Sequence, residues 1–186
     1  MKRELLPEPL KKESGNLKGQ TGARYSWMKL EICLENNRQS ITTELLELLA
    51  DEYLLYTKTR NAHWNIEGGD FHSMHLFFEL QYRELDEVID KVAERIRALG
   101  SYAPASLSSF LNMTGLTETR MERNDSIALV KELLEDHEYI IMSQRKGINR
   151  FTDLYLDSGT GDFISGLVEK HEEMAWKLRA QLPACR

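Results

Sequence analysis

The chain has 186 residues, a length that fits one domain of ordinary size with a modest surplus at one end. Hydrophobic residues make up 41% and charged residues 29%, so the chain can bury a core and stay in solution. No apolar run is longer than Tyr53–Tyr56, which excludes a membrane-spanning helix, and the N-terminus lacks the apolar stretch of a secretory signal. Two cysteines, Cys33 and Cys185, are too few for a disulfide scaffold, so we expect a reducing, cytoplasmic setting.

The charge is distributed unevenly along the chain. A formal net charge of −6 argues against nucleic acid as a partner. However, residues 1–30 carry seven basic and three acidic side chains, while the remainder carries 17 basic and 27 acidic ones. Because the first segment also contains prolines and glycines, we expect residues 1–35 to form a mobile basic arm on an acidic body.

Periodic apolar residues predict the first two helices. Leu45, Leu49, Tyr56 and His63 share one face of a helix that ends near Gly68. The next stripe alternates steps of four and three residues and predicts a helix that ends at Gly100. Its members are Phe71, His75, Phe78, Tyr82, Leu85, Ile89, Val92, Ile96 and Leu99.

Two further helices follow a long connection at residues 101–124, which has room for one short helix. A stripe from Ile127 to Tyr155 predicts the third helix, and one from Phe163 to Leu182 predicts the fourth. No segment alternates as a strand does. The long crossover lets helices two and three lie parallel, so the expected fold is all-α, a ferritin-like four-helix bundle over residues 36–182 with a short tail at 183–186.

Two histidines lie on apolar faces, His63 at the end of the first helix and His75 early in the second. Taken singly, such a histidine is more often a hydrogen-bonded core residue than a ligand. Glu79 stands one helical turn after His75, so both side chains can reach one metal ion. Asp90 and Glu94 form a second pair with this spacing, for which a solvated acidic face is the alternative.

The two pairs lie too far apart to share an ion within one helix, because His75 and Asp90 are separated by about 22 Å at the rise of an α-helix. They can share one if this helix packs antiparallel against its own copy across a two-fold axis. With His63, the set has two imidazoles, three carboxylates and no thiolate, which suits iron. The Glu-x-x-His spacing of di-iron sites inside one bundle occurs nowhere in the chain.

Two stretches resemble the Dps family, the DNA-protecting miniferritins of starved bacteria. The first consists of His63–Phe71 (HWNIEGGDF), His75, Glu79, Asp90 and Ala93–Arg95. The second consists of Gly159–Phe163 (GTGDF), His171–Glu172 and Trp176–Ala180. The similarity covers about residues 36–182. One departure is Glu79, where many members have an aspartate, and this longer carboxylate shifts the ligand distance.

The resemblance implies a hollow shell of twelve identical subunits that oxidises iron(II) at its two-fold interfaces. The oxidant would be hydrogen peroxide in preference to oxygen, and the ferric product would be stored as mineral inside. The iron ligands would be His63, His75 and Glu79 of one chain with Asp90 and Glu94 of its mate. Because two adjacent Fe(II) ions deliver two electrons to one peroxide, no hydroxyl radical need be released.

Two roles are possible for several other residues. Trp64 is either a sacrificial electron source or packing at the helix end. Asp157 and Asp162 fall where the family lines its three-fold iron pores, although helix capping explains Asp162 equally well. His72 is an additional candidate ligand.

Two more histidines receive structural interpretations. His137, on the third helix, is most simply a buried and hydrogen-bonded residue. His171, on the fourth, has no acid at ligand spacing.

Two functions of different classes remain, beside the alternative that the family scaffold is kept while the site holds zinc or no metal. One is iron oxidation and storage in the cytoplasm, without a membrane partner. The other is a DNA-coating, nucleoid-associated protein whose shell presents twelve basic arms, a valency that multiplies a modest charge. The basic residues nearest the start of the arm are the candidate DNA contacts: Lys2, Arg3, Lys11, Lys12 and Lys18.

Overall fold

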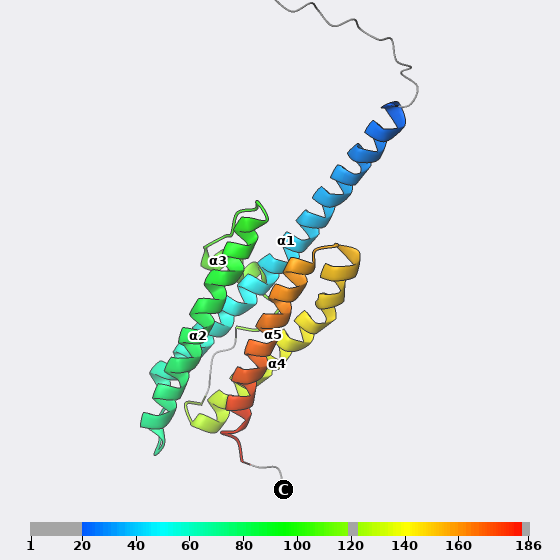
Figure 1. The fold of residues 1–186 in the computed structure, drawn as a ribbon. Coiled ribbons are helices and arrows are strands. Elements are labelled where there is room, and N and C mark those ends of the chain that lie inside the picture. The colour runs from blue at the N-terminus through cyan, green and yellow to red at the C-terminus, as the bar shows by residue number, and fades with distance from the viewer. Residues whose placement is uncertain (1–19, 119–122, 184–186) are drawn as a thin grey trace, which may run out of the picture. The chain divides into compact units, whose positions relative to one another are not determined.

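Helices account for the regular secondary structure of the residues that the structure describes (Figure 1). The computed structural model describes residues 20–118 and 123–183, with side chains from residue 35 on. The elements within these ranges are α1 (Gln20–Asn65), α2 (Phe71–Ala98), α3 (Leu107–Met113), α4 (Ser126–Asn149), the π-helical turn η1 (Arg150–Leu154) and α5 (Ser158–Arg179). The described ranges contain no strand, which confirms the all-α, ferritin-like fold class.

The chain divides into two units, and the bundle belongs to the unit that begins at Asn36. Helix α1 begins at Gln20, within residues 1–35, and the mobility expected for that segment stays a prediction. Neither glycine nor proline occurs between Ala23 and Glu67, so the helix continues without interruption over this stretch. None of the helices in the described part of the chain combines the length and apolar character of a membrane span.

Helices α1 and α2 form an antiparallel hairpin. The turn between them contains Gly68, whose φ of +124° is a conformation that other residues rarely adopt. Along the hairpin, the Tyr56 and Tyr82 rings meet edge to face at 6.1 Å. Nearer the turn, His63 lies against His75. This pairing brings the end of α1 next to the start of α2.

Helix α5 runs antiparallel to α2, as the order of their contacts shows. Arg95, near the end of α2, hydrogen-bonds to Thr160 in the first turn of α5. Glu84, halfway along α2, pairs with Lys170 at 3.1 Å and with Lys177 at 3.3 Å. Residue numbers therefore rise along α5 as they fall along α2.

Helices α4 and α5 are also antiparallel. Glu138 on α4 pairs with Arg179 at 2.7 Å, and Arg145 pairs with Glu172. Since both α2 and α4 run opposite to α5, they are parallel to each other. The long connection, which carries the short helix α3, is what permits this arrangement, as expected for the ferritin-like bundle.

The core lies along apolar stripes of the four long helices. On α2 the buried residues are Met74, Phe78, Gln81, Leu85, Val88, Val92 and Ile96. The buried face is thus rotated from the predicted stripe, and Phe71 remains 46% exposed. The spacing of apolar residues does not determine which of two adjacent helix faces is buried when both faces contain apolar residues.

The third predicted helix is not continuous to Tyr155. It widens into η1 at Arg150, where the Tyr155 N–H donates to the Arg150 carbonyl and the Asp157 N–H donates to the Phe151 carbonyl, both at 2.8 Å. After the turn, Leu156 takes the left-handed conformation with a φ of 58°. This geometry places Asp157 at the start of α5.

Candidate metal centre

His63 and His75 form a tightly packed pair across the α1–α2 hairpin. Their rings stack with centroids 3.7 Å apart and an interplanar angle of 22°. The Nδ1 atom of His63 lies 2.8 Å from the carbonyl oxygen of His75, and the Nδ1 atom of His75 lies 2.7 Å from the carbonyl oxygen of His63. The backbone carbonyl of each histidine therefore holds the imidazole ring of the other in place.

These reciprocal bonds determine which nitrogen of each ring carries the hydrogen. A carbonyl oxygen only accepts, so each Nδ1 carries a hydrogen and donates it. In a neutral imidazole the Nε2 lone pair is then free to bind a metal. A histidine that binds metal through one nitrogen commonly donates from the other to a carbonyl or carboxylate. The pair thus offers two oriented nitrogen donors.

Glu79 is the carboxylate one turn beyond His75 on α2. Its side chain is 25% exposed and forms an ion pair with Arg83, which is 66% exposed. A pair this exposed contributes little stability, so a divalent cation can displace Arg83 from the carboxylate at small cost. His72 lies exposed in the first turn of α2.

Asp90 and Glu94 are exposed on the later part of α2. Since α2 runs without interruption from Phe71 to Ala98, these acids stay far along the helix from His75. Within the described residues, no three histidine, cysteine, aspartate or glutamate side chains form a group that could hold a metal ion. The structure brings the two histidines together and keeps the two acids apart from them.

Trp64 follows His63 and lies beside Arg60. The indole is 63% exposed, so little of it packs against this chain. The Arg60 guanidinium carbon lies 5.0 Å from the centroid of the indole ring. A cation–π contact is therefore the interaction that the structure shows for this ring.

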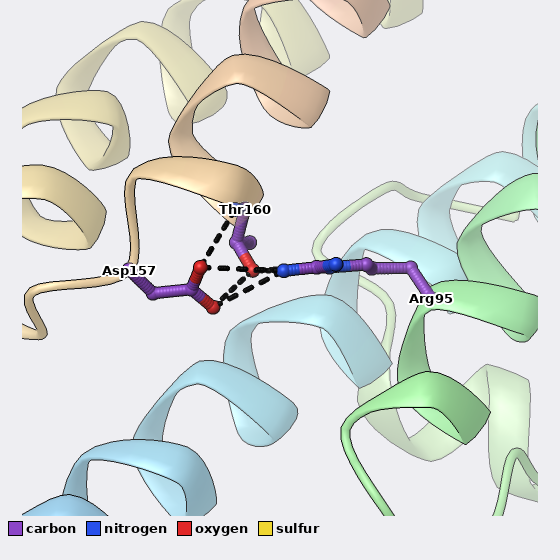
Figure 2. A network of polar contacts seen from close by, with 3 residues as sticks. All are labelled: Arg95, Asp157 and Thr160. Atoms are coloured by element: carbon purple, nitrogen blue, oxygen red, sulfur yellow. Dashed lines mark hydrogen bonds and ion pairs between the residues drawn. The ribbon is translucent and has the colours of Figure 1, made fainter.

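The two candidate pore residues occupy different environments at the start of α5. Asp157 caps the helix, because its carboxylate accepts from the Thr160 N–H at 2.9 Å and from the Thr160 hydroxyl at 2.5 Å. Arg95 reaches the same carboxylate from α2 at 3.3 Å, as Figure 2 shows. Asp162 is exposed and lies inside the helix, so the capping explanation belongs to Asp157 and is wrong for Asp162.

The pKa of Asp157 reflects this network. Burial alone would raise the pKa of Asp157, but the hydrogen bonds from Thr160 and the charge of Arg95 outweigh burial and lower it below its ordinary value of 3.8. Asp162 instead lines a pocket of about 310 Å³ between α2 and α5, together with Glu84 and Glu87. The two aspartates therefore lie in different environments.

A buried polar chain inside the bundle was missed by sequence reasoning. His171 Nε2 donates to Glu52 Oε1 at 2.7 Å, and the Nδ1 atoms of His171 and His137 lie 2.9 Å apart. All three residues are at most 1% exposed. The expectation of a buried, hydrogen-bonded His137 is met, but the acid beside His171 comes from α1, which spacing along α5 could not reveal.

The pKa of His137 lies well below its ordinary value of 6.5. Burial disfavours the charged ring, and His171 adds like-charge repulsion. His137 is therefore neutral at physiological pH. The remaining candidates, Lys2, Arg3, Lys11, Lys12 and Lys18, lie outside the described residues, as does Cys185.

Comparisons with known proteins agree with this fold. The ferritin-like domain family matches residues 42–186. A low temperature-induced protein of Nostoc is 40% identical over 78% of this chain and 82% of its own length. DNA protection during starvation protein 2 of Bacillus anthracis is 32% identical over 78% of this chain and 98% of its own length.

Solved structures show the same fold. The Dps protein of Vibrio cholerae, described as a ferritin-like diiron-carboxylate protein, has a TM-score of 0.75 and 29% identity, covering 80% of this chain and 92% of that one. Dps of Thermosynechococcus elongatus has a TM-score of 0.76 and 26% identity, covering 82% and 96%. The bundle and these likenesses define a ferritin-like protein. Within that class, the chain belongs to the Dps family.

Proposed function

We propose that this protein is a miniferritin that oxidises Fe(II), preferably with hydrogen peroxide, and stores the Fe(III) product, thereby protecting DNA from oxidative damage. The observation that carries the proposal is the reciprocal pairing of His63 and His75, which leaves both Nε2 atoms free to bind iron. Family membership supports it, since relatives are named for DNA protection or described as diiron-carboxylate proteins.

The ligands come from two chains in this proposal. His63, His75 and Glu79 of one subunit meet Asp90 and Glu94 of its mate across a two-fold axis, which generates two equivalent sites per dimer. Nitrogen and carboxylate donors without thiolate suit iron in both oxidation states. Iron displaces Arg83 from Glu79 as it binds.

The reaction at such a site balances without a radical product. Each Fe(II) ion gives one electron, and one hydrogen peroxide takes two electrons and two protons to become two waters. Two ions bound side by side therefore supply the whole reduction. The Fe(III) ions then move to a mineral inside a shell of twelve subunits.

Iron reaches the interior through acidic pores near the start of α5. Asp157 is already engaged by Thr160 and Arg95, so the exposed Asp162 contributes more of the attraction for cations. Three copies of this carboxylate around a three-fold axis would raise the local concentration of Fe(II).

A rate measurement with a double variant tests the function. Apoprotein mixed with Fe(II) and peroxide is expected to consume peroxide rapidly and to yield ferric iron that stays with the protein. His63→Ala combined with His75→Ala removes both nitrogen donors and is expected to lower the rate at least about a hundredfold, since loss of ligands and their supports costs that much in metal sites.

The matched control is Asp86→Ala, which removes an exposed side chain without an assigned role from the same helix and is expected to leave the rate unchanged. Circular dichroism verifies that both variants keep their helices. A wild-type rate in the double variant would show that the site lies elsewhere.

A further inference from the structure

Arg60 lies among three aromatic side chains beside His63. Its guanidinium carbon is 4.6 Å from the ring centroid of Tyr82, 5.0 Å from that of Trp64 and 5.6 Å from that of Tyr56. A cation within about 6 Å of a ring centroid is attracted by the negative face of the ring. The structure therefore holds one fixed positive charge against all three rings.

A hydrogen bond helps to hold the guanidinium in this position. Arg60 Nη1 donates to the Tyr56 hydroxyl at 2.9 Å. The Arg60 Nε atom is buried and has no hydrogen-bond partner among the described residues. Tyr82 also contacts His63 edge to face, with centroids 5.2 Å apart. Tyr82 thus contacts both the guanidinium and the proposed iron ligand.

The rings matter because peroxide needs two electrons. If only one Fe(II) ion occupies the site, the second electron must come from another donor. Trp64 is a candidate because it follows His63 directly. Its indole would lose one electron and then its Nε1 proton to water. With the iron electron and one further proton from solvent, peroxide would again become two waters, but Trp64 would be left as a radical.

We propose that Arg60 shields Trp64 from this oxidation. An indole radical cation next to a guanidinium group is disfavoured by charge repulsion, and its formation removes the cation–π attraction. Because arginine stays charged at physiological pH, the effect is permanent. Arg60 makes the ring a poorer electron donor, so that the electrons for peroxide come from iron. This role rests on the proposed function, but the shielding itself does not require iron.

The chain provides two matched references. Trp176 is 63% exposed, the same as Trp64, and no cation–π contact of the described residues involves it. Arg97 lies 4.4 Å from the centroid of Tyr102, so Arg97→Gln removes a comparable charge and contact at another place.

An iron-free oxidation experiment tests the shielding. Wild-type protein is exposed to photochemically generated carbonate radical, which becomes carbonate as it takes one electron from a side chain. Peptide mass spectrometry then measures oxidised Trp64 and Trp176 separately. Acrylamide quenching of single-tryptophan proteins measures the accessibility of each ring. At equal accessibility, Trp64 is expected to be oxidised about two- to fivefold more slowly than Trp176, as a cation–π contact of this exposure predicts.

Variants separate charge from packing. Arg60→Gln is expected to raise Trp64 oxidation about two- to fivefold with unchanged quenching by acrylamide, whereas Arg60→Lys keeps the charge and most of the protection. Arg97→Gln is expected to change nothing at Trp64. Equal oxidation of Trp64 in the wild type and in Arg60→Gln would overturn the proposal. If Arg60→Gln does not fold, equal oxidation of Trp64 and Trp176 in the wild type would overturn it instead.

A second arm connects the shielding with iron. With one Fe(II) per site and peroxide, Arg60→Gln is expected to show more oxidised Trp64 than wild type. If the iron-free difference is present but this one is absent, the shielding stands without the link to the iron site. If the proposed function fails, neither protein speeds the consumption of peroxide by Fe(II) above the rate without protein, while the carbonate-radical result is unaffected.

Discussion

His137 and His171 connect α4 to α5 through buried side chains, and Glu52 extends this connection to α1. A buried polar group without a hydrogen-bond partner destabilises the folded state, because it has lost its hydration and gained nothing in return. One carboxylate oxygen of Glu52, Oε2, is buried and has no hydrogen-bond partner in the described part of the chain. The layer therefore makes the bundle sensitive to changes in protonation.

Stability is predicted to fall in acid because of His137. Its folded pKa lies well below 6.5, so below pH 6.5 the unfolded chain binds a proton that the folded chain does not. The free energy of unfolding is therefore highest above pH 6.5. It decreases as the pH falls, by up to about 1.4 kcal/mol per pH unit. Guanidinium unfolding at fixed protein concentration between pH 7 and 5 measures this slope.

His137→Gln is expected to flatten the dependence on pH, since it removes the group that titrates. His72→Gln, at an exposed position, is the control and should retain the wild-type slope. Identical slopes in wild type and His137→Gln would exclude His137 as the source.

Residue spacing predicts contacts only where one element or one tight turn connects the partners. His63 approaches His75 through the short α1–α2 hairpin, so the contact between these two histidines was predictable. The bond between Glu52 and His171 joins residues 119 positions apart on different helices. No local pattern carries that information, because it depends on how α1, α4 and α5 pack.

At the scale of elements, the ends of helices follow from capping chemistry. Asp125 accepts from the Ala128 N–H at the start of α4, and Asp157 does the same for Thr160 in α5. Asp157 also binds Arg95, so it connects α5 to α2. Asp157 consequently stabilises the first turn of α5 and also links this turn to α2.

Asp157→Ala is predicted to destabilise the bundle by about 0.5–2 kcal/mol, the usual cost of a lost N-cap. Asp162→Ala is the matched control, since an exposed residue within the helix should change stability by less than about 0.5 kcal/mol. Chemical denaturation monitored by circular dichroism compares the two. An equal loss in both variants would show that Asp157 has no special role as a cap.

Acid should weaken this cap as well. Because the folded pKa of Asp157 lies below 3.8, the stabilisation is present above pH 3.8 and is lost as pH falls through the folded value.

Glycine explains which helix boundaries were predictable. Gly68 and Gly100 both adopt positive φ values, and the chain turns close to each of them. The boundary at Arg150 has no such signal, because the π turn continues the same apolar stripe with different hydrogen bonding.

At the scale of the whole molecule, the chain combines a basic N-terminal segment with an acidic remainder. The charge contrast favours a second function, the coating of DNA by several arms at once. The names of relatives point to DNA protection, which direct contact or removal of iron and peroxide could each provide.

Deletion of residues 1–24 tests the DNA contact. If the arm binds DNA, the intact protein retards DNA in a gel at low salt, and both the deletion and moderate salt abolish the shift. Light scattering verifies that the truncated protein assembles as the intact protein does. No retardation by the intact protein at low salt would remove DNA binding from its functions.

The central claim is that two chains share each iron site, and mixed subunits test it directly. One chain carries His63→Ala and His75→Ala, and the other carries Asp90→Ala and Glu94→Ala. Each protein alone should be inactive. In a mixed dimer, the histidines of the second chain meet the acids of the first, so one of the two sites is intact.

Coassembly at equal amounts is therefore predicted to restore about one quarter of the wild-type peroxide consumption, because half of the dimers are mixed and each has one working site. Shells of the two proteins mixed only after assembly serve as the control. Coassembled shells that remain as inactive as the separate proteins would contradict ligand sharing between chains.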